Sequence, residues 1–293
     1  MNDLLPAAVR ARVGGSKWLP LHARADVGVG ARRSKAIGPG IEFAQYRDYE
    51  MGDDLRYLDK HVYARLGRTV IRQFTVEQQM RASILLDASA SMSVDPRKWR
   101  RAKELAALCG FVTLNGSDRV TFASFGGKGL CWGTSFSQPA RLEQNLDRID
   151  EIEPEGRTER LDEIARRSLE HLQGRGMLIV ISDLFMDGVE EALKIWRARG
   201  QEILAVQVLG PHDVEPGEEL LGWSRLVDIE THERSERYID ARALAEYREA
   251  FRSWQEELRD AVWAAEGRWV SVRSDRDQLA TLLTSFRRTG LIT

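Results

Sequence analysis

Oxygen-bearing side chains stand at three points of this chain where an apolar run ends or a helix is expected to begin. A carboxylate and two hydroxyls alternate along residues 87–91, a threonine follows Gly156-Arg157, and a second carboxylate follows the apolar run 177–181. Such oxygens are the ligands of a hard dication, and Mg²⁺ binds them in an octahedron. The candidate metal ligands are Asp87, Ser89, Ser91, Thr158 and Asp183.

The mixture of neutral and charged oxygens indicates what such an ion would do. We expect the hydroxyls of Ser89, Ser91 and Thr158 to ligate directly, while Asp87 and Asp183 bind through water or orient the hydroxyls. Because most direct ligands are then neutral, the ion keeps much of its positive charge and can accept a carboxylate from another protein. The pattern predicts a Mg²⁺-dependent binding site, with Mn²⁺ or Ca²⁺ as substitutes, and not a hydrolytic centre.

These residues meet only if the segments before them are neighbouring strands. The short apolar run 83–87 is typical of a strand buried on both faces of a parallel sheet. Strands and helices alternate after it, and ligands of such sheets bind outside the carboxyl ends of the strands. We predict an α/β fold, a doubly wound, mostly parallel, Rossmann-like sheet. The predicted strands are 69–76, 83–87, 118–125, 177–182, 202–209, 225–229, 236–239 and 269–272, and the helices 97–115, 140–150, 160–173, 188–199, 240–267 and 276–288.

The first 80 residues differ from the rest in pattern and charge. Residues 1–35 contain seven basic and two acidic side chains, a local net charge of +5, although the whole chain carries −2. Residues 1–40 show no sustained period, which indicates an extended arm with at most a short helix. We therefore divide the chain into a basic arm with an irregular extension, residues 1–80, and an α/β domain, residues 81–293.

Composition excludes several classes of protein. With 43% hydrophobic and 30% charged residues among 293, the chain is neither collagen-like nor wholly disordered. No apolar run approaches the roughly 20 residues that cross a bilayer, and the first residues lack a signal-peptide pattern. Cys109 and Cys131 are too few for a disulfide framework or a zinc cage. We expect a cytoplasmic protein with reduced thiols.

The spaced Asp, Ser, Ser, Thr and Asp residues match a known pattern. Their order and their places at strand ends resemble the metal-ion-dependent adhesion site of von Willebrand factor A domains. The resemblance implies that fold for residues 81–293 and the ligand roles given above.

A second resemblance covers residues 30–95. These residues resemble the signature of the bacterial family catalogued as domain of unknown function fifty-eight, with one departure: Lys60 stands where the family has Trp after Asp59. That resemblance implies a MoxR-type AAA+ ATPase as partner, and a client protein that supplies an acidic ligand to the metal. The matching segments include Gly38–Phe43, Tyr46–Tyr49, Gly52–Arg56, Tyr63–Arg65, Val70–Phe74 and Leu85–Met92.

Three functions compete at this point. The first is a non-enzymatic, Mg²⁺-dependent adaptor. The second is a phosphoryl-transfer enzyme with Asp87 as nucleophile, but the general acid that such phosphatases carry two residues later is here Ser89, whose hydroxyl cannot supply a proton near neutral pH. The third is a nucleic-acid or anionic-membrane binder that uses residues 1–35. The absence of GxGxxG after a strand and of GxxxxGK[ST] argues against nucleotide binding.

Each candidate residue also has a structural interpretation. Serine, threonine and aspartate before a helix are common N-caps, which bind free backbone N–H groups without any metal. Alternating charges among the aromatic residues of the extension favour a structural network of ion pairs over a catalytic cluster. That charged cluster comprises Glu42, Arg47, Asp53, Asp54, Arg56, Asp59, Arg65 and Arg72.

Overall fold

The computed structural model describes residues 3–19, 37–38, 42–75, 79–157, 159–276 and 279–293. The chain separates into two compact units, one formed by Met1–Pro20 with Met80–Thr293 and one by Leu21–Gln79. This division differs from the predicted one, because the first residues belong to the α/β unit and not to the extension. In the described part of the chain, no helix combines the length and the apolar character that crossing a bilayer requires.

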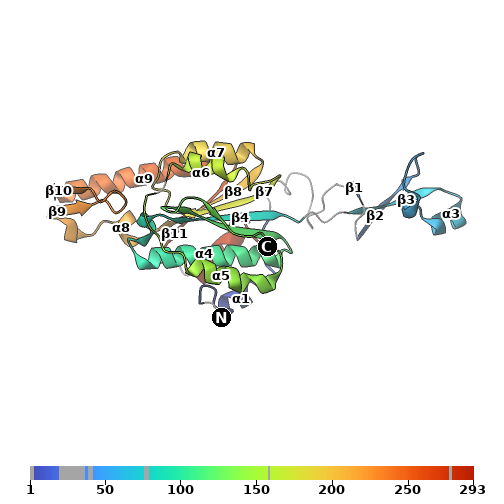
Figure 1. The fold of residues 1–293 in the computed structure, drawn as a ribbon, viewed down its shortest axis with the longest axis horizontal. Helices are drawn as coiled ribbons and strands as arrows, with labels where there is room; N and C mark the ends of the chain where they lie inside the picture. Colours follow the sequence, from blue (N-terminus) through green and yellow to red (C-terminus); the bar gives the residue numbers. More distant parts are fainter. Residues whose placement is uncertain (1–2, 20–36, 39–41, 76–78, 158, 277–278) are drawn as a thin grey trace. The chain divides into compact units, whose positions relative to one another are not determined.

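The larger unit is built on a six-stranded sheet with the order β11-β8-β7-β4-β5-β6 (Figure 1). Its long strands are parallel, and the two-residue β6 runs antiparallel to β5. The predicted α/β fold with a mostly parallel sheet is therefore confirmed. The strands are β4 Arg81–Ala88, β5 Arg119–Gly126, β6 Cys131–Trp132, β7 Gly176–Ser182, β8 Gln201–Leu209 and β11 Arg268–Arg273.

Side chains of the central strands alternate between two apolar cores. Ile84 and Leu86 of β4 pack with helices α1, α4, α5 and α10, whereas Leu85 packs on the other face with α6, α7 and α9 (Figure 1). Burial on both faces explains why these strands are continuously apolar. The helices are α1 Ala7–Val13, α4 Pro96–Asn115, α5 Leu142–Asp150, α6 Leu161–Ser168, α7 Val189–Ala198, α9 Ala241–Ala264 and α10 Leu279–Arg288.

The N-terminal residues form part of the core and not an extended arm. Leu4, Leu5 and Trp18 are each 1% exposed, and the indole N–H of Trp18 donates to Thr113 Oγ1 at 2.9 Å. Trp18 also bridges to Ile292, so two segments that are far apart in the sequence lie side by side here. The burial of three large apolar side chains fixes this segment to the larger unit.

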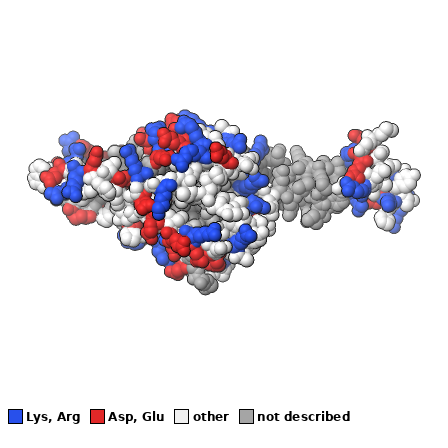
Figure 2. All heavy atoms as spheres, in the orientation of Figure 1, with Lys and Arg blue, Asp and Glu red and all other residues white. Residues whose placement is uncertain are grey.

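Among the described basic side chains of residues 1–35, Arg10 forms an ion pair, and Arg12 and Lys17 are exposed. Arg10 pairs with Glu143 of α5, while Arg24, Arg32, Arg33 and Lys35 lie outside the described residues. On the face drawn in Figure 2, basic and acidic side chains are interleaved over the helices of the larger unit. This distribution gives no support to nucleic-acid binding through the described part of the arm.

The chain between β8 and α9 carries a small sheet of its own. Strands β9 (Gly222–Val227) and β10 (Arg234–Ile239) pair with each other in antiparallel register and do not join the edge of the main sheet. The short helix α8 (Pro211–Val214) connects β8 to this hairpin. Single 3₁₀ turns occur at η1 Leu55–Tyr57, η2 Ala90–Ser93, η3 Pro139–Arg141 and η4 Glu218–Leu220.

The smaller unit contains a three-stranded antiparallel sheet with the order β1-β3-β2 and the helix α3. Asp59 caps α3, because its carboxylate accepts the backbone N–H groups of His61 and Val62 at 2.9 and 3.2 Å. Lys60 is the exposed first residue of this helix. The elements are β1 Ile37–Gly38, β2 Glu42–Asp48, α3 Lys60–Leu66 and β3 Val70–Thr75.

Candidate metal centre

The carboxyl ends of β4 and β7 lie side by side at the centre of the sheet, where Leu86 pairs with Ile181. The chain runs from β4 to β5 on one side, and from β7 to β8 and β11 on the other. Such a divergence of connections is the place where open α/β sheets bind ligands. Asp87 is the penultimate residue of β4 and Asp183 directly follows β7, so the sheet brings both predicted carboxylates to this position.

The Asp87 carboxylate is fully buried and bound by neutral donors. The Ser89 backbone N–H donates to Oδ1 at 2.9 Å, and the Ser182 hydroxyl donates to Oδ2 at 2.6 Å. Burial, followed by the nearby charge of Asp183, raises the pKa of Asp87 to about 7. The negative charge of Asp87 is therefore held at a free-energy cost that a bound cation would relieve.

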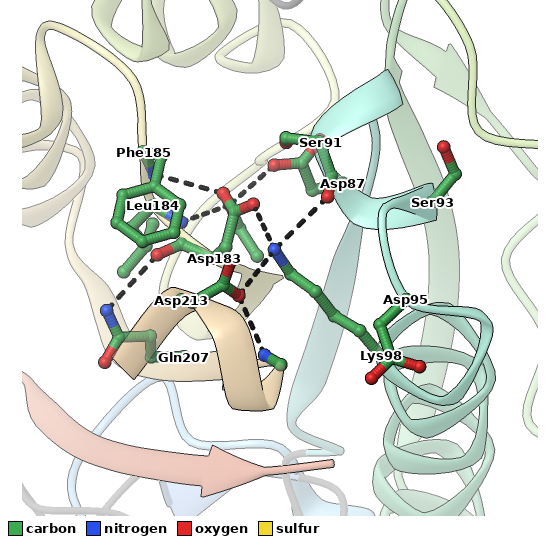
Figure 3. Close-up of polar contacts among 12 residues, drawn as sticks. Asp87, Ser91, Ser93, Asp95, Lys98, Asp183, Leu184, Phe185, Gln207 and Asp213 are labelled. Atoms are coloured by element: carbon green, nitrogen blue, oxygen red, sulfur yellow. Dashed lines mark hydrogen bonds and ion pairs between the residues drawn. The ribbon is translucent and has the colours of Figure 1, made fainter. Parts of the chain in front are cut away.

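Two serine hydroxyls lie next to each other beside this carboxylate. Ser89 Oγ and Ser91 Oγ are 3.0 Å apart. Neighbouring oxygens of an octahedral Mg²⁺ site, each about 2.1 Å from the ion, are also about 3 Å apart. Ser89 is almost completely buried and Ser91 is partly exposed, so the pair reaches solvent at Ser91. The next serine, Ser93, bonds to the carbonyl of Ala90 at 2.7 Å and points away from the carboxylates (Figure 3).

The Asp183 carboxylate is fully buried and has a charged partner. Its Oδ1 accepts the backbone N–H of Phe185 at 3.0 Å, and its Oδ2 lies 2.8 Å from the ammonium group of Lys98. Gln207 of β8 donates to the Asp183 carbonyl at 3.2 Å. Backbone and side chain of Asp183 are thus both fixed in position.

Lys98 joins three strand ends from its place on α4 (Figure 3). Its ammonium nitrogen lies 2.8 Å from Asp183 Oδ2, 2.9 Å from Asp213 Oδ2 and 3.2 Å from the Ser91 carbonyl. Burial by itself lowers the pKa of Lys98, but the charges of Asp183 and Asp213 outweigh it, and the pKa is raised. Lys98 is therefore a buried, charged ammonium at the edge of the candidate site.

Sequence reasoning missed Lys98 and Asp213, although each left a signal. Lys98 lies four residues before Ala102, on the helix face that is otherwise apolar, so a lysine stands at a position expected to be buried. Asp213 follows the predicted strand 202–209, which is a third strand end at the same sheet edge. Both signals depend on knowing which strands are neighbours.

The loop before α6 is hydrogen-bonded to the residues at the end of β4 and just after it. The Ala90 N–H donates to the Gly156 carbonyl at 3.0 Å, and the Glu155 N–H donates to the Ala88 carbonyl at 3.0 Å. A Cβ at Gly126 would lie 2.6 Å from the Ala88 carbonyl carbon, so this close approach requires glycine. The predicted ligand Thr158 lies outside the described residues.

The donor set fits Mg²⁺ in chemical type, and the two serine hydroxyls also fit it in spacing. Among the described residues, no group of three or more His, Cys, Asp or Glu side chains could hold a metal ion. A cation at this place would therefore depend on the Ser89 and Ser91 hydroxyls together with the carboxylates of Asp87 and Asp183. Of the five predicted ligands, the structure brings these four together.

Comparison with protein families identifies the chain. A family model described as "Protein of unknown function DUF58" matches residues 45–260. The chain belongs to the DUF58 family. The matched range contains the candidate ligands, and also Lys98 and Asp213.

Individual proteins are similar to the chain at low identity. Uncharacterized protein Mb1516 of Mycobacterium bovis is 27% identical over 271 residues, which cover 87% of this chain and 82% of that protein. Among solved structures, BatB from Bacteroides thetaiotaomicron has 16% identity and a TM-score of 0.40, covering 71% of this chain and 99% of BatB. A von Willebrand factor type A protein from Catenulispora acidiphila has 13% identity and a TM-score of 0.42, covering 75% of this chain and 43% of that one.

Proposed function

We propose that the larger unit of this DUF58 protein is a Mg²⁺-dependent protein-binding module. One observation carries the proposal: the hydroxyls of Ser89 and Ser91 lie 3.0 Å apart beside two fully buried carboxylates. The proposed ligands are Asp87, Ser89, Ser91, Thr158 and Asp183.

Neighbouring groups hold the two carboxylates of the site in fixed orientations. The Ser182 hydroxyl holds Asp87, while the Phe185 N–H and Lys98 hold Asp183, so neither carboxylate is free to rotate. The serine hydroxyls add no charge. When bound, Mg²⁺ would supply a coordination position that attracts a carboxylate of a partner protein. The partly exposed Ser91 is the side from which such a carboxylate could approach.

An adaptor role suits these groups better than catalysis. Asp87 is 0% exposed and both its oxygens accept hydrogen bonds, which makes it a poor nucleophile. We propose that the module works with a MoxR-type AAA+ ATPase in chaperone-like or metal-insertion assembly, and that the client protein supplies the acidic ligand. Support for this partnership comes from the family resemblance and not from a contact in this chain.

Calorimetric titration of Mg²⁺ into the full-length, EDTA-treated protein tests the proposal. We expect the Ser89→Ala/Ser91→Ala variant to lose at least about tenfold in affinity, because two ligands are removed without a change in charge. Ser93→Ala is the matched control: Ser93 lies in the same turn, points away from the carboxylates and should leave Mg²⁺ binding unchanged. Equal binding by the wild type and the double variant would rule the serine site out.

A further inference from the structure

We infer that Lys98 is a built-in cation of this site, which sets the charge of the site and thereby its preference for an acidic partner. The inference rests on the proposed Mg²⁺ site and adds to it a buried side chain that is not one of the proposed ligands. Lys98 is 1% exposed, and its side chain extends from α4 to the strand ends (Figure 3). Ser91, by contrast, is partly exposed.

The contacts of Lys98 place it among acidic oxygens and not in an isolated ion pair. Its ammonium nitrogen lies within 2.9 Å of carboxylate oxygens from both Asp183 and Asp213. Asp213 is fixed in turn, because the Gly210 N–H donates to its Oδ2 at 2.8 Å and the Tyr247 hydroxyl donates to its carbonyl at 2.8 Å. The aromatic ring of Phe185 lies 5.5 Å from the same ammonium. A cation at this position is therefore built into the fold.

Formal charges show what the ammonium changes. Counted formally, the carboxylates of Asp87, Asp183 and Asp213 carry three negative charges and the Lys98 ammonium one positive charge, so the net is two negative charges, which one dication neutralises. Without Lys98 the cluster carries three negative charges and stays negative after a dication binds. In a buried site of low dielectric constant, one unit of charge changes the affinity for a second ion strongly. Lys98 thus weakens the hold on the metal and keeps the loaded site receptive to a carboxylate.

Removal of Lys98 should therefore move two properties in opposite directions. Metal affinity should rise, because the dication meets one more uncompensated carboxylate. Binding of an external carboxylate should fall, because the loaded site is then negative. A purely structural role for Lys98 predicts a different result, in which both properties fall together as the site loses its shape.

The experiment uses Mn²⁺ as the metal and acetate as the carboxylate, with the full-length chain. Free Mn²⁺ is measured by electron paramagnetic resonance, and bound acetate by the relaxation of its methyl protons. We expect Lys98→Met to bind Mn²⁺ about tenfold more tightly and to lose the acetate signal. Asp213→Asn should bind Mn²⁺ about tenfold more weakly, and Lys98→Met/Asp213→Asn, which restores the charge, should behave like the wild type.

A second buried lysine of α4 provides the control. Lys103 is 8% exposed and pairs with Asp150 at 2.6 Å, away from the strand ends, so Lys103→Met should leave Mn²⁺ affinity unchanged. If Lys98→Met is too unstable to purify, Asp213→Asn and the double variant still decide the question. Affinities that do not follow the charge series overturn the inference alone. Equal Mn²⁺ binding by the wild type and Ser89→Ala/Ser91→Ala overturns the metal site itself.

Discussion

Two clusters of charged side chains, one in each unit of the protein, differ in what surrounds them. At the sheet edge, the side chains of Lys98 and Asp183 are 1% and 0% exposed. In the smaller unit, those of Arg56 and Asp54 are 82% and 41% exposed. The first pair has lost its water and depends on neighbouring protein groups, whereas the second remains hydrated.

The direction of the pKa shifts separates the two clusters further. Burial and the charge of Asp183 raise the pKa of Asp87, whereas hydrogen bonds from Arg47 and Arg56 lower the pKa of Asp53 and Asp54. A lowered pKa means that the charged carboxylate is stabilised by the partner that it already has. A raised pKa means that the surroundings do not stabilise the charged carboxylate. Ion pairs in the smaller unit are therefore structural, and the sheet edge is where a cation would be stabilised.

The largest effect on stability should come from the buried cluster. Lys98→Met leaves the Asp183 and Asp213 carboxylates without their ammonium, and we expect it to cost about 3–5 kcal/mol of unfolding free energy in EDTA. Urea unfolding followed by tryptophan fluorescence measures it, because all eight tryptophans lie outside Leu21–Gln79. A loss below about 1 kcal/mol would show that the pair is as hydrated as a surface pair.

A smaller effect on stability should come from Asp59 of the smaller unit, whose carboxylate accepts three hydrogen bonds. Asp59 caps α3 and accepts the Tyr46 hydroxyl at 3.0 Å. Asp59→Ala should speed amide hydrogen exchange in α3 about fivefold, as expected for loss of a helix cap. The tryptophan-detected unfolding of the larger unit should stay as in the wild type. A shift in that unfolding would show that the two clusters are coupled.

The smallest effect should come from an exposed ion pair. Arg56 lies 2.6 Å from Asp54, but both side chains are exposed to water, and such pairs contribute little. Arg56→Ala should leave amide exchange in α3 and unfolding of the larger unit unchanged within error. An effect on exchange comparable to that of Asp59→Ala would contradict the contrast between the hydrated and the buried cluster.

Local pattern in the sequence was enough to predict the strands that position the site. Continuous apolar runs at 83–87 and 177–182 correspond to β4 and β7, and the polar residues after each run mark the carboxyl ends. Because parallel strands end at one sheet edge, Asp87 and Asp183 could be expected at the same edge of the sheet.

Contacts between distant segments could not be predicted in this way. Residues 3–19 show no helical period strong enough to place them, and Trp18 is fixed by Thr113 and Ile292, which are far away in the sequence. The role of Lys98 depends on Asp213, a residue 115 positions later that follows the predicted strand 202–209. Such pairs become visible only when the strand order is known.

The position of a bound dication tests the central claim most directly. Crystals of the full-length protein soaked in Mn²⁺ and measured at the manganese absorption edge locate the ion by its anomalous scattering. We expect one peak within bonding distance, about 2.2 Å, of both Ser89 Oγ and Ser91 Oγ, with Lys98 still paired to Asp213. An anomalous peak at another position, or no peak at millimolar Mn²⁺, would contradict the claim that these serines bind a dication.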